Sequence, residues 1–154
     1  MDIISKSHRD QEGVTFIELL FAVAVLSILM LVAIPAYSNY KSKVKISEGL
    51  VLVSEILNRV EETYRETGVW PEDNTSAGVG ISEEYSTKWV KGIYVELDAN
   101  DKAQVRIIYN ASDIGSLQSD DDLIFRPIIT SSSIIWDCTG GTIKSFVRPK
   151  RCKS

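Results

Sequence analysis

The sequence predicts an α+β fold in which one long N-terminal α-helix packs on a four-stranded antiparallel sheet. Three observations support this class: an apolar run near the N-terminus that continues into a helical stripe, four strand-like segments in series, and two cysteines near the C-terminus. Strands that follow one another without intervening helices pair antiparallel. The chain has 154 residues, of which 25% are charged. Outside the apolar run, we expect one soluble domain with a modest core.

The apolar run extends from residue 19 to residue 40 and contains no charged residue. Residues 16–34 include thirteen Phe, Ile, Leu or Val residues, which together favour bilayer insertion by about 4–8 kcal/mol. Glu18 opposes insertion, but a carboxylate near the end of a span costs less than the ~3 kcal/mol expected at mid-membrane. We therefore expect a membrane-spanning segment. A secretory signal peptide is less favoured, because its apolar core is shorter and residues 34–37 make a poor cleavage site.

The charges that flank this run do not set its orientation. Two basic residues, Lys6 and Arg9, precede the run, and three lysines, Lys41, Lys43 and Lys45, follow it closely. Because cytoplasmic flanks normally carry the excess of positive charge, these counts do not place the N-terminus in the cytoplasm.

Apolar residues at helical spacing continue the helix beyond the run. They alternate in steps of four and three residues: Ile46, Leu50, Val53, Leu57, Val60 and Tyr64. Gly68 and the following Pro71 are typical of a helix end. Counted from Val14, the helix has about 53 residues and is roughly 80 Å long. Pro35 lacks a backbone donor and crowds the preceding turn, so we expect a bend or a locally weak helix there.

Half of this helix, residues 14–40, is too apolar to stay in water, so we expect it to be stable in a bilayer or packed among copies of itself. The other half, residues 41–67, lies on the domain. Residues 68–91 are rich in turn formers and predict a connecting loop, and residues 92–138 predict the sheet. Its strands are expected at Ile93–Leu97, Gln104–Tyr109, Leu123–Ile129 and Ser133–Cys138, with a hairpin turn at residues 98–101.

Histidine and cysteine are scarce in this chain. His8 is the one histidine, and Cys138 and Cys152 are the two cysteines, which argues against a zinc site and against Cys–His catalysis. A pair of cysteines beyond a membrane segment suggests an oxidising compartment and one disulfide, whose loop closure stabilises the fold by about 3 kcal/mol. No glycine-rich phosphate loop is present. We expect no enzyme, no metal site and no cofactor.

The segment GVTFIELL at residues 13–20 resembles the processing site of type IV pilins. In that family a prepilin peptidase cuts after the glycine on the cytoplasmic side and methylates the new amine. The resemblance implies a cleaved leader, residues 1–13, a new N-terminus at Val14, and Glu18 as the fifth residue of the mature chain. Pro35 falls where the family has its helix proline, and the resemblance implies an extensible joint there. Val14 occupies a position that is usually phenylalanine.

Glu18 needs a partner, because a lone carboxylate in an apolar stretch is normally functional. Cleavage creates a cationic amine at Val14, about one helical turn away. We expect Glu18 to pair with the Val14 amine of an adjacent subunit and to set the axial register. Pairing of Glu18 within its own chain is the alternative. Val14, Phe16 and Glu18 are the residues expected to take part in assembly.

The C-terminal half carries further resemblance. The segment YRETGVWP at residues 64–71 resembles the helix-end motif of type IVa pilins, and residues 136–138 with 149–152 resemble their C-terminal disulfide loop. The resemblance implies a fibre with residues 14–40 as its core and residues 41–154 as its outer shell. The implied partners are further copies of the chain, the prepilin peptidase, the inner-membrane assembly machinery and an outer-membrane secretin.

The implied location is the inner membrane for the precursor and then an extracellular pilus on a Gram-negative bacterium. Adhesion, twitching motility and DNA uptake are the implied outputs. A minor pilin or a pilin-like DNA-binding receptor is one alternative to a major subunit. A monomeric, single-span anchored periplasmic domain is an alternative from another class.

The C-terminal tail is basic, and no acidic residue follows Asp137. Its cations are candidates for contact with DNA or another anionic surface: Lys144, Arg148, Lys150, Arg151 and Lys153. A solvated loop is the favoured alternative. Ser154 is a candidate for an O-linked glycan, which the family resemblance suggests.

Overall fold

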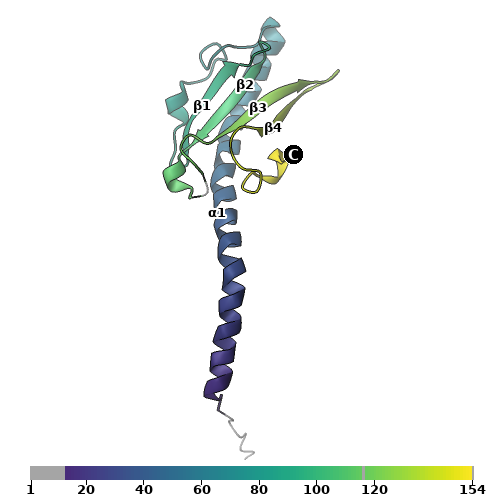
Figure 1. Ribbon diagram of the computed structural model, residues 1–154. Helices are drawn as coiled ribbons and strands as arrows, with labels where there is room; N and C mark the ends of the chain where they lie inside the picture. The colour runs from purple at the N-terminus through teal and green to yellow at the C-terminus, as the bar shows by residue number, and fades with distance from the viewer. Residues whose placement is uncertain (1–12, 116, 154) are drawn as a thin grey trace, which may run out of the picture. The chain divides into compact units, whose positions relative to one another are not determined.

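The computed structural model describes residues 13–115 and 117–153 of the chain (Figure 1). It contains one long helix, four strands and three short 3₁₀ turns, so the predicted α+β fold is confirmed. The elements are α1 (Phe16–Thr67), η1 (Ser82–Tyr85), β1 (Val90–Leu97), β2 (Ala103–Tyr109), η2 (Ala111–Asp113), β3 (Asp122–Ile129), β4 (Ile134–Gly140) and η3 (Lys150–Cys152).

The chain divides into two compact units, and α1 runs through both. The N-terminal unit ends at Ala36 and the head unit begins at Tyr37. In the N-terminal unit the described residues are all exposed in the single chain, and α1 is long and apolar enough to cross a membrane. Between Glu18 and Ala36 the one polar residue is Ser27. Its hydroxyl donates to the Val23 carbonyl at 2.8 Å, which lowers the cost of placing the hydroxyl in an apolar medium.

Pro35 lies inside α1, and the helix is continuous through it. The expected weak point is therefore not a break in the helix. Pro35 still lacks the N–H that would bond to the Leu31 carbonyl, so this turn has one hydrogen bond fewer than its neighbours.

The end of α1 is confirmed where the sequence predicts it. The last helical residue is Thr67. Gly68 has φ of 75°, a left-handed conformation that favours glycine. Its N–H donates to the Tyr64 carbonyl at 2.9 Å, which satisfies one of the free carbonyls at the helix end.

The sheet of the head unit has the strand order β1-β2-β3-β4, and every neighbouring pair is antiparallel. The strands begin or end up to three residues from the predicted bounds. The turn between β1 and β2 is built on Asp98, whose carboxylate accepts the N–H groups of Asn100 at 2.8 Å and Lys102 at 3.0 Å. The N–H of Lys102 and then that of Asn100 lower the pKa of Asp98. The predicted hairpin turn is confirmed.

One face of the sheet and one face of α1 form the core of the head unit. Alternate residues of β2 are buried from Ala103 to Tyr109, as a strand covered on one face requires. The buried residues of α1 are Ser42, Ile46, Gly49, Val53, Ile56, Leu57 and Val60. The predicted stripe is correct at four of its six positions, whereas Leu50 and Tyr64 are only half-buried. Ile56 and Gly49 lie in the contact because the buried face is rotated toward them.

Tyr109 makes a close contact between the sheet and the helix. Its buried hydroxyl donates to the Ile46 carbonyl at 2.8 Å, and burial raises the pKa of Tyr109, so the phenol keeps the proton it donates. The ring crosses α1 at Gly49. A Cβ at that position would lie 2.4 Å from the Tyr109 hydroxyl oxygen. Glycine is therefore required there by close approach rather than by backbone conformation.

A buried polar side chain, Asn74, holds the connection between α1 and β1. Its amide Nδ2 donates to the carbonyls of Ile93 and Gly80, each at 3.0 Å, and its Oδ1 accepts the Val95 N–H at 2.7 Å. Ile93 and Val95 belong to β1, the edge strand. Asn74 thus bonds to the free edge of the sheet and fixes the loop on it.

The Gly49–Tyr109 contact makes a prediction for stability. Gly49→Ala should lower the free energy of unfolding by about 1–3 kcal/mol through overpacking, although alanine in a helix is otherwise favoured by up to about 1 kcal/mol. Thermal unfolding of the full-length protein in detergent, followed by circular dichroism, measures the change. The same substitution should cost less in a Tyr109→Phe background, because the clashing oxygen is gone. Equal costs in both backgrounds would contradict the contact.

Candidate assembly site and C-terminal loop

The first turn of α1 is a reciprocal cap between Thr15 and Glu18. The Thr15 N–H and the Thr15 hydroxyl both donate to Glu18 Oε2, at 2.9 and 2.7 Å, and the Glu18 N–H donates to Thr15 Oγ1 at 3.4 Å. This arrangement is a capping box, which satisfies two backbone donors that a helix start leaves free. The carboxylate also lies at the positive end of the helix dipole.

In the uncut chain Glu18 therefore forms hydrogen bonds with Thr15 of its own chain. The pairing with a Val14 amine stays a prediction, because the nitrogen of Val14 is an amide until the chain is cut. Thr15 was not among the candidate site residues, although its spacing of three residues from Glu18 is a recognisable cap pattern.

The residues around the expected cut are open to solvent. Gly13 has no neighbour near the position of a Cβ. Val14 and Phe16 are 79% and 75% exposed. Residues 1–12 of the expected leader, with the flanking cations Lys6 and Arg9, lie outside the described residues, as does Ser154.

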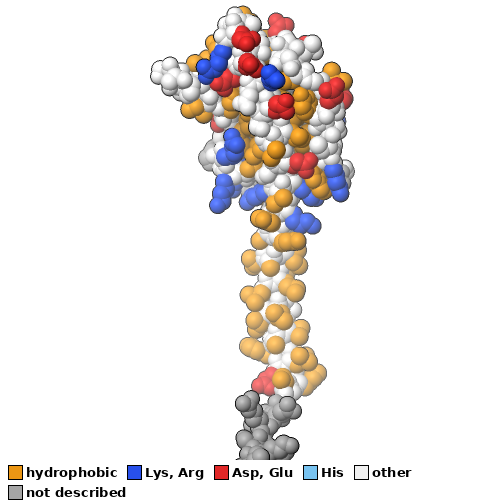
Figure 2. All heavy atoms as spheres, turned by 180° about the vertical axis from the view of Figure 1, so that it is seen from behind, with side chains coloured by type: hydrophobic (Ala, Val, Ile, Leu, Met, Phe, Trp, Pro, Cys, Tyr) orange, Lys and Arg blue, Asp and Glu red, His pale blue; other side chains and the backbone are white. Residues whose placement is uncertain are grey.

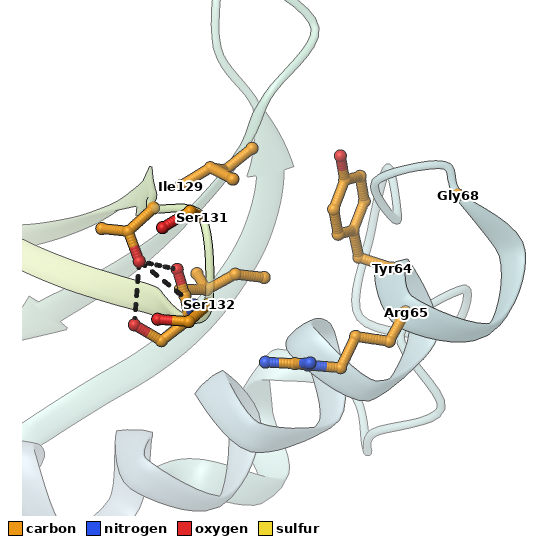
Figure 3. A pocket seen from close by; sticks show the side chains of 9 residues that line it. Tyr64, Arg65, Gly68, Ile129, Ser131 and Ser132 are labelled. Carbon is orange, nitrogen blue, oxygen red and sulfur yellow. Dashed lines mark hydrogen bonds between the residues drawn. The ribbon is translucent and has the colours of Figure 1, made fainter.

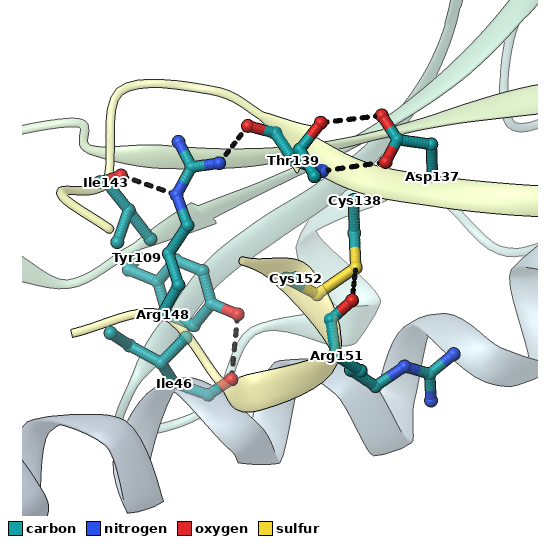
Figure 4. Close-up of a disulfide and its surroundings, with 9 residues drawn as sticks. All are labelled: Ile46, Tyr109, Asp137, Cys138, Thr139, Ile143, Arg148, Arg151 and Cys152. Atoms are coloured by element: carbon teal, nitrogen blue, oxygen red, sulfur yellow. Dashed lines mark hydrogen bonds between the residues drawn. A yellow bond between two sulfur atoms is a disulfide. The ribbon is translucent and has the colours of Figure 1, made fainter. Parts of the chain in front are cut away.

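The C-terminal loop is closed by the predicted disulfide between Cys138 and Cys152, whose Cα atoms are 4.8 Å apart. Both cysteines are buried. Cys138 lies in β4 and Cys152 in η3, so the bond ties the end of the chain to the edge of the sheet (Figure 4).

The prediction that Arg148 belongs to a basic surface is wrong. It is buried, with 7% of its surface exposed. Its Nε donates to the Ile143 carbonyl at 2.6 Å and its Nη1 donates to the Thr139 carbonyl (Figure 4). Its Nη2 donates to the Gly141 carbonyl at 2.8 Å. The planar guanidinium matches these backbone acceptors. Arg148 therefore holds the loop together and is not available to an external anion.

The other four candidates, Lys144, Lys150, Arg151 and Lys153, are exposed. They stay compatible with a surface contact, and that contact stays a prediction.

A shallow cleft of about 350 Å³ lies between the end of α1 and the turn that joins β3 to β4 (Figure 3). Tyr64, Arg65 and Gly68 line one side of it, and residues 129–134 line the other. The polar groups of the turn bond to one another: the Thr130 hydroxyl donates to the Ser133 carbonyl at 2.7 Å and accepts the Ser133 N–H at 3.1 Å. These bonds stabilise the turn and give the cleft no reactive group.

Among the described residues, no group of three His, Cys, Asp or Glu side chains is placed to hold a metal ion. His8 lies outside these residues.

Arg148 makes a prediction that separates it from the exposed cations. Arg148→Gln should lower the free energy of unfolding by about 1.5–3 kcal/mol, because backbone carbonyls lose a charged donor. The matched control, Lys150→Gln, should change it by less than about 0.5 kcal/mol, as expected of an exposed residue. Urea unfolding of both variants checks this. A larger loss in Lys150→Gln than in Arg148→Gln would contradict the structural role.

The fold and the site together define a class: a subunit with a disulfide-closed head and an exposed apolar helix that must be covered by lipid or by protein. A family model described as pilin (bacterial filament) matches residues 42–153, and one described as the prokaryotic N-terminal methylation motif matches residues 8–34. The chain therefore belongs to the pilin family, and it is a structural subunit of the type IV pilin kind.

Similar proteins carry matching names. The chain is 43% identical over 86 residues to a type IV major pilin protein PilE of Neisseria gonorrhoeae. These aligned residues make up 56% of this chain and 52% of the relative. It is 26% identical over 144 residues to the fimbrial protein EcpC of Eikenella corrodens, covering 94% and 92% of the two chains. It is 29% identical over 141 residues to the type IV major fimbrial protein FimA of Dichelobacter nodosus, covering 84% and 88%. The chain spans about half the length of the Neisseria relatives that it matches.

Proposed function

We propose that the chain is made as an inner-membrane precursor, is cut between Gly13 and Val14, and polymerises through residues 14–40 into a type IV pilus. The observation that carries this proposal is the apolar half of α1, which begins two residues after the expected new N-terminus and is exposed along its length in the described part of the chain. The methylation-motif match over residues 8–34 supports the cut. Copies of the same helix provide the apolar surface that buries it.

The partners follow from this route. A prepilin peptidase cuts the precursor, the inner-membrane assembly machinery extracts the mature chain, and a secretin passes the fibre through the outer membrane of a Gram-negative bacterium. Adhesion, twitching motility and DNA uptake are the proposed outputs. Pro35, one hydrogen bond short within α1, is proposed as the extensible joint.

The direct test is mass spectrometry of fibres sheared from cells that express the chain. The mature subunit should lack the first thirteen residues and should begin at Val14 with a methylated amine. A chain that keeps residues 1–13 and is absent from the sheared fraction would instead support a monomeric anchored periplasmic domain. Low abundance among other pilins in the fibre would indicate a minor subunit.

Glu18 makes a second prediction for assembly. Glu18→Gln keeps an oxygen that accepts the hydrogen bonds of Thr15 but loses the charge that would pair with the Val14 amine. We expect Glu18→Gln to lower the yield of sheared fibres about as much as Glu18→Ala does, while the processed subunit still accumulates in the membrane. Quantitative blotting of the sheared and membrane fractions measures this.

Two controls isolate the charge. Thr15→Ala removes the cap hydroxyl and keeps the carboxylate, and Glu55→Ala removes an exposed carboxylate from the head unit. Both should assemble better than Glu18→Gln. A normal fibre yield from Glu18→Gln would refute the proposed ion pair and leave Glu18 as a helix cap only.

DNA binding is a second candidate function, which the exposed cations Lys150 and Arg151 favour. A gel shift with double-stranded DNA should weaken when both residues are changed to glutamine. Unchanged binding would eliminate this surface.

A further inference from the structure

Three lysines follow the apolar run and have no role in the function proposed so far. In a precursor whose head lies outside the cytoplasm, Lys41, Lys43 and Lys45 stand on the side of the membrane that is normally poor in positive charge. Their position therefore calls for a favourable contact on that side.

Two of these lysines belong to a continuous stripe on one face of α1. Tyr37, Tyr40, Lys41, Val44 and Lys45 follow one another at helical spacing and line a shallow, mainly apolar cavity of about 300 Å³. The two tyrosines are 65% and 64% exposed, and Val44 is 54% exposed. Within the described part of the chain, this face of the head unit has little cover.

The cations of this stripe lie against aromatic rings. The Lys41 Nζ is 5.6 Å from the centroid of the Tyr37 ring. The Lys45 Nζ is 4.2 Å from the centroid of the Trp89 ring, and the Lys88 Nζ is 4.6 Å from the same ring. The Trp89 ring therefore contacts two ammonium groups, which concentrates positive charge beside the stripe. Figure 2 shows that Lys and Arg side chains gather at the end of the head unit where its part of α1 begins.

The distance along α1 places the stripe at a membrane surface. From Phe16 to Ala36 the helix covers about 31 Å at 1.5 Å per residue, which equals the ~30 Å of hydrocarbon in a bilayer. Residues 37–45 then fall in the layer of headgroups. Tyrosine rings prefer this layer, and lysines reach from it to phosphates.

We propose that the stripe of Tyr37, Tyr40, Lys41, Val44 and Lys45, together with Lys88, binds the headgroup of an anionic phospholipid. The rings and Val44 contact the upper part of the acyl chains, and the ammonium groups contact the phosphate. This inference rests on the proposed membrane precursor. Anionic lipid is favoured over the acidic surface of a second copy, because the stripe combines cations with exposed tyrosines beside a span.

The test uses the full-length chain in nanodiscs of phosphatidylcholine alone or mixed with phosphatidylglycerol. Acetylation rates of individual lysine amines are measured by mass spectrometry. Lys41 and Lys45 should react about fivefold more slowly in the anionic discs. Lys102, in the turn at the far end of β1 from Trp89, should react equally in both. Equal rates at Lys41 and Lys45 in the two lipids would overturn the proposal.

Matched variants separate a site from general charge. Lys41→Gln should reduce the phosphatidylglycerol that co-purifies from mixed lipid and should lessen the protection of Lys45, whereas Lys102→Gln should do neither. Equal effects of the two variants would overturn the site. Protection by inorganic phosphate in neutral discs would assign the stripe to a soluble anion instead.

The lysines could instead be protected in neutral discs, but only when several copies share one disc. If the double variant Glu61→Gln/Glu62→Gln loses this protection, the stripe binds a second copy. Flotation of the protein with the discs shows whether the chain has inserted, which separates a failed insertion from an absent lipid site. A chain that fails to insert contradicts the proposed precursor, whereas an inserted chain with equal lysine rates contradicts only the lipid site.

Discussion

The exposed apolar surface of the first half of α1 is the constraint on which the rest of the molecule depends. Residues 13–38 are all exposed in the single chain, and no water-soluble monomer can leave such a surface open. This half of the helix must therefore be covered by lipid or by protein. The cap at Thr15 and Glu18 stabilises the start of this helix.

The head unit is small, and single side chains do much of the work that regular secondary structure does elsewhere. Asn74 attaches a long loop to β1, Arg148 gathers the carbonyls of the last loop, and the disulfide joins that loop to β4. Each of these contacts reduces the freedom of a segment that has no repeating hydrogen bonds of its own. The close packing of Tyr109 on Gly49 then allows the sheet to approach the helix.

The sequence was a good guide wherever structure is determined locally. The end of α1 follows from Gly68, and the turn after β1 follows from Asp98, because both depend on neighbouring backbone groups. The apolar half of α1 follows from its uninterrupted apolar run, and the second half and the strands follow from periodicity. Arg148 was mistaken for a surface cation, because a count of charges does not show which carbonyls will surround a side chain in the folded loop. The contact at Gly49 was also missed, since its partner lies far away in sequence and glycine has no side chain.

The attachment of Asn74 to β1 has a consequence for copies of the chain held at high concentration. An open strand edge presents unpaired backbone N–H and C=O groups to any neighbouring chain and is a common cause of aggregation. The amide of Asn74 occupies part of that edge at Ile93 and Val95. Heads at high local concentration are thereby hindered from pairing through this strand edge.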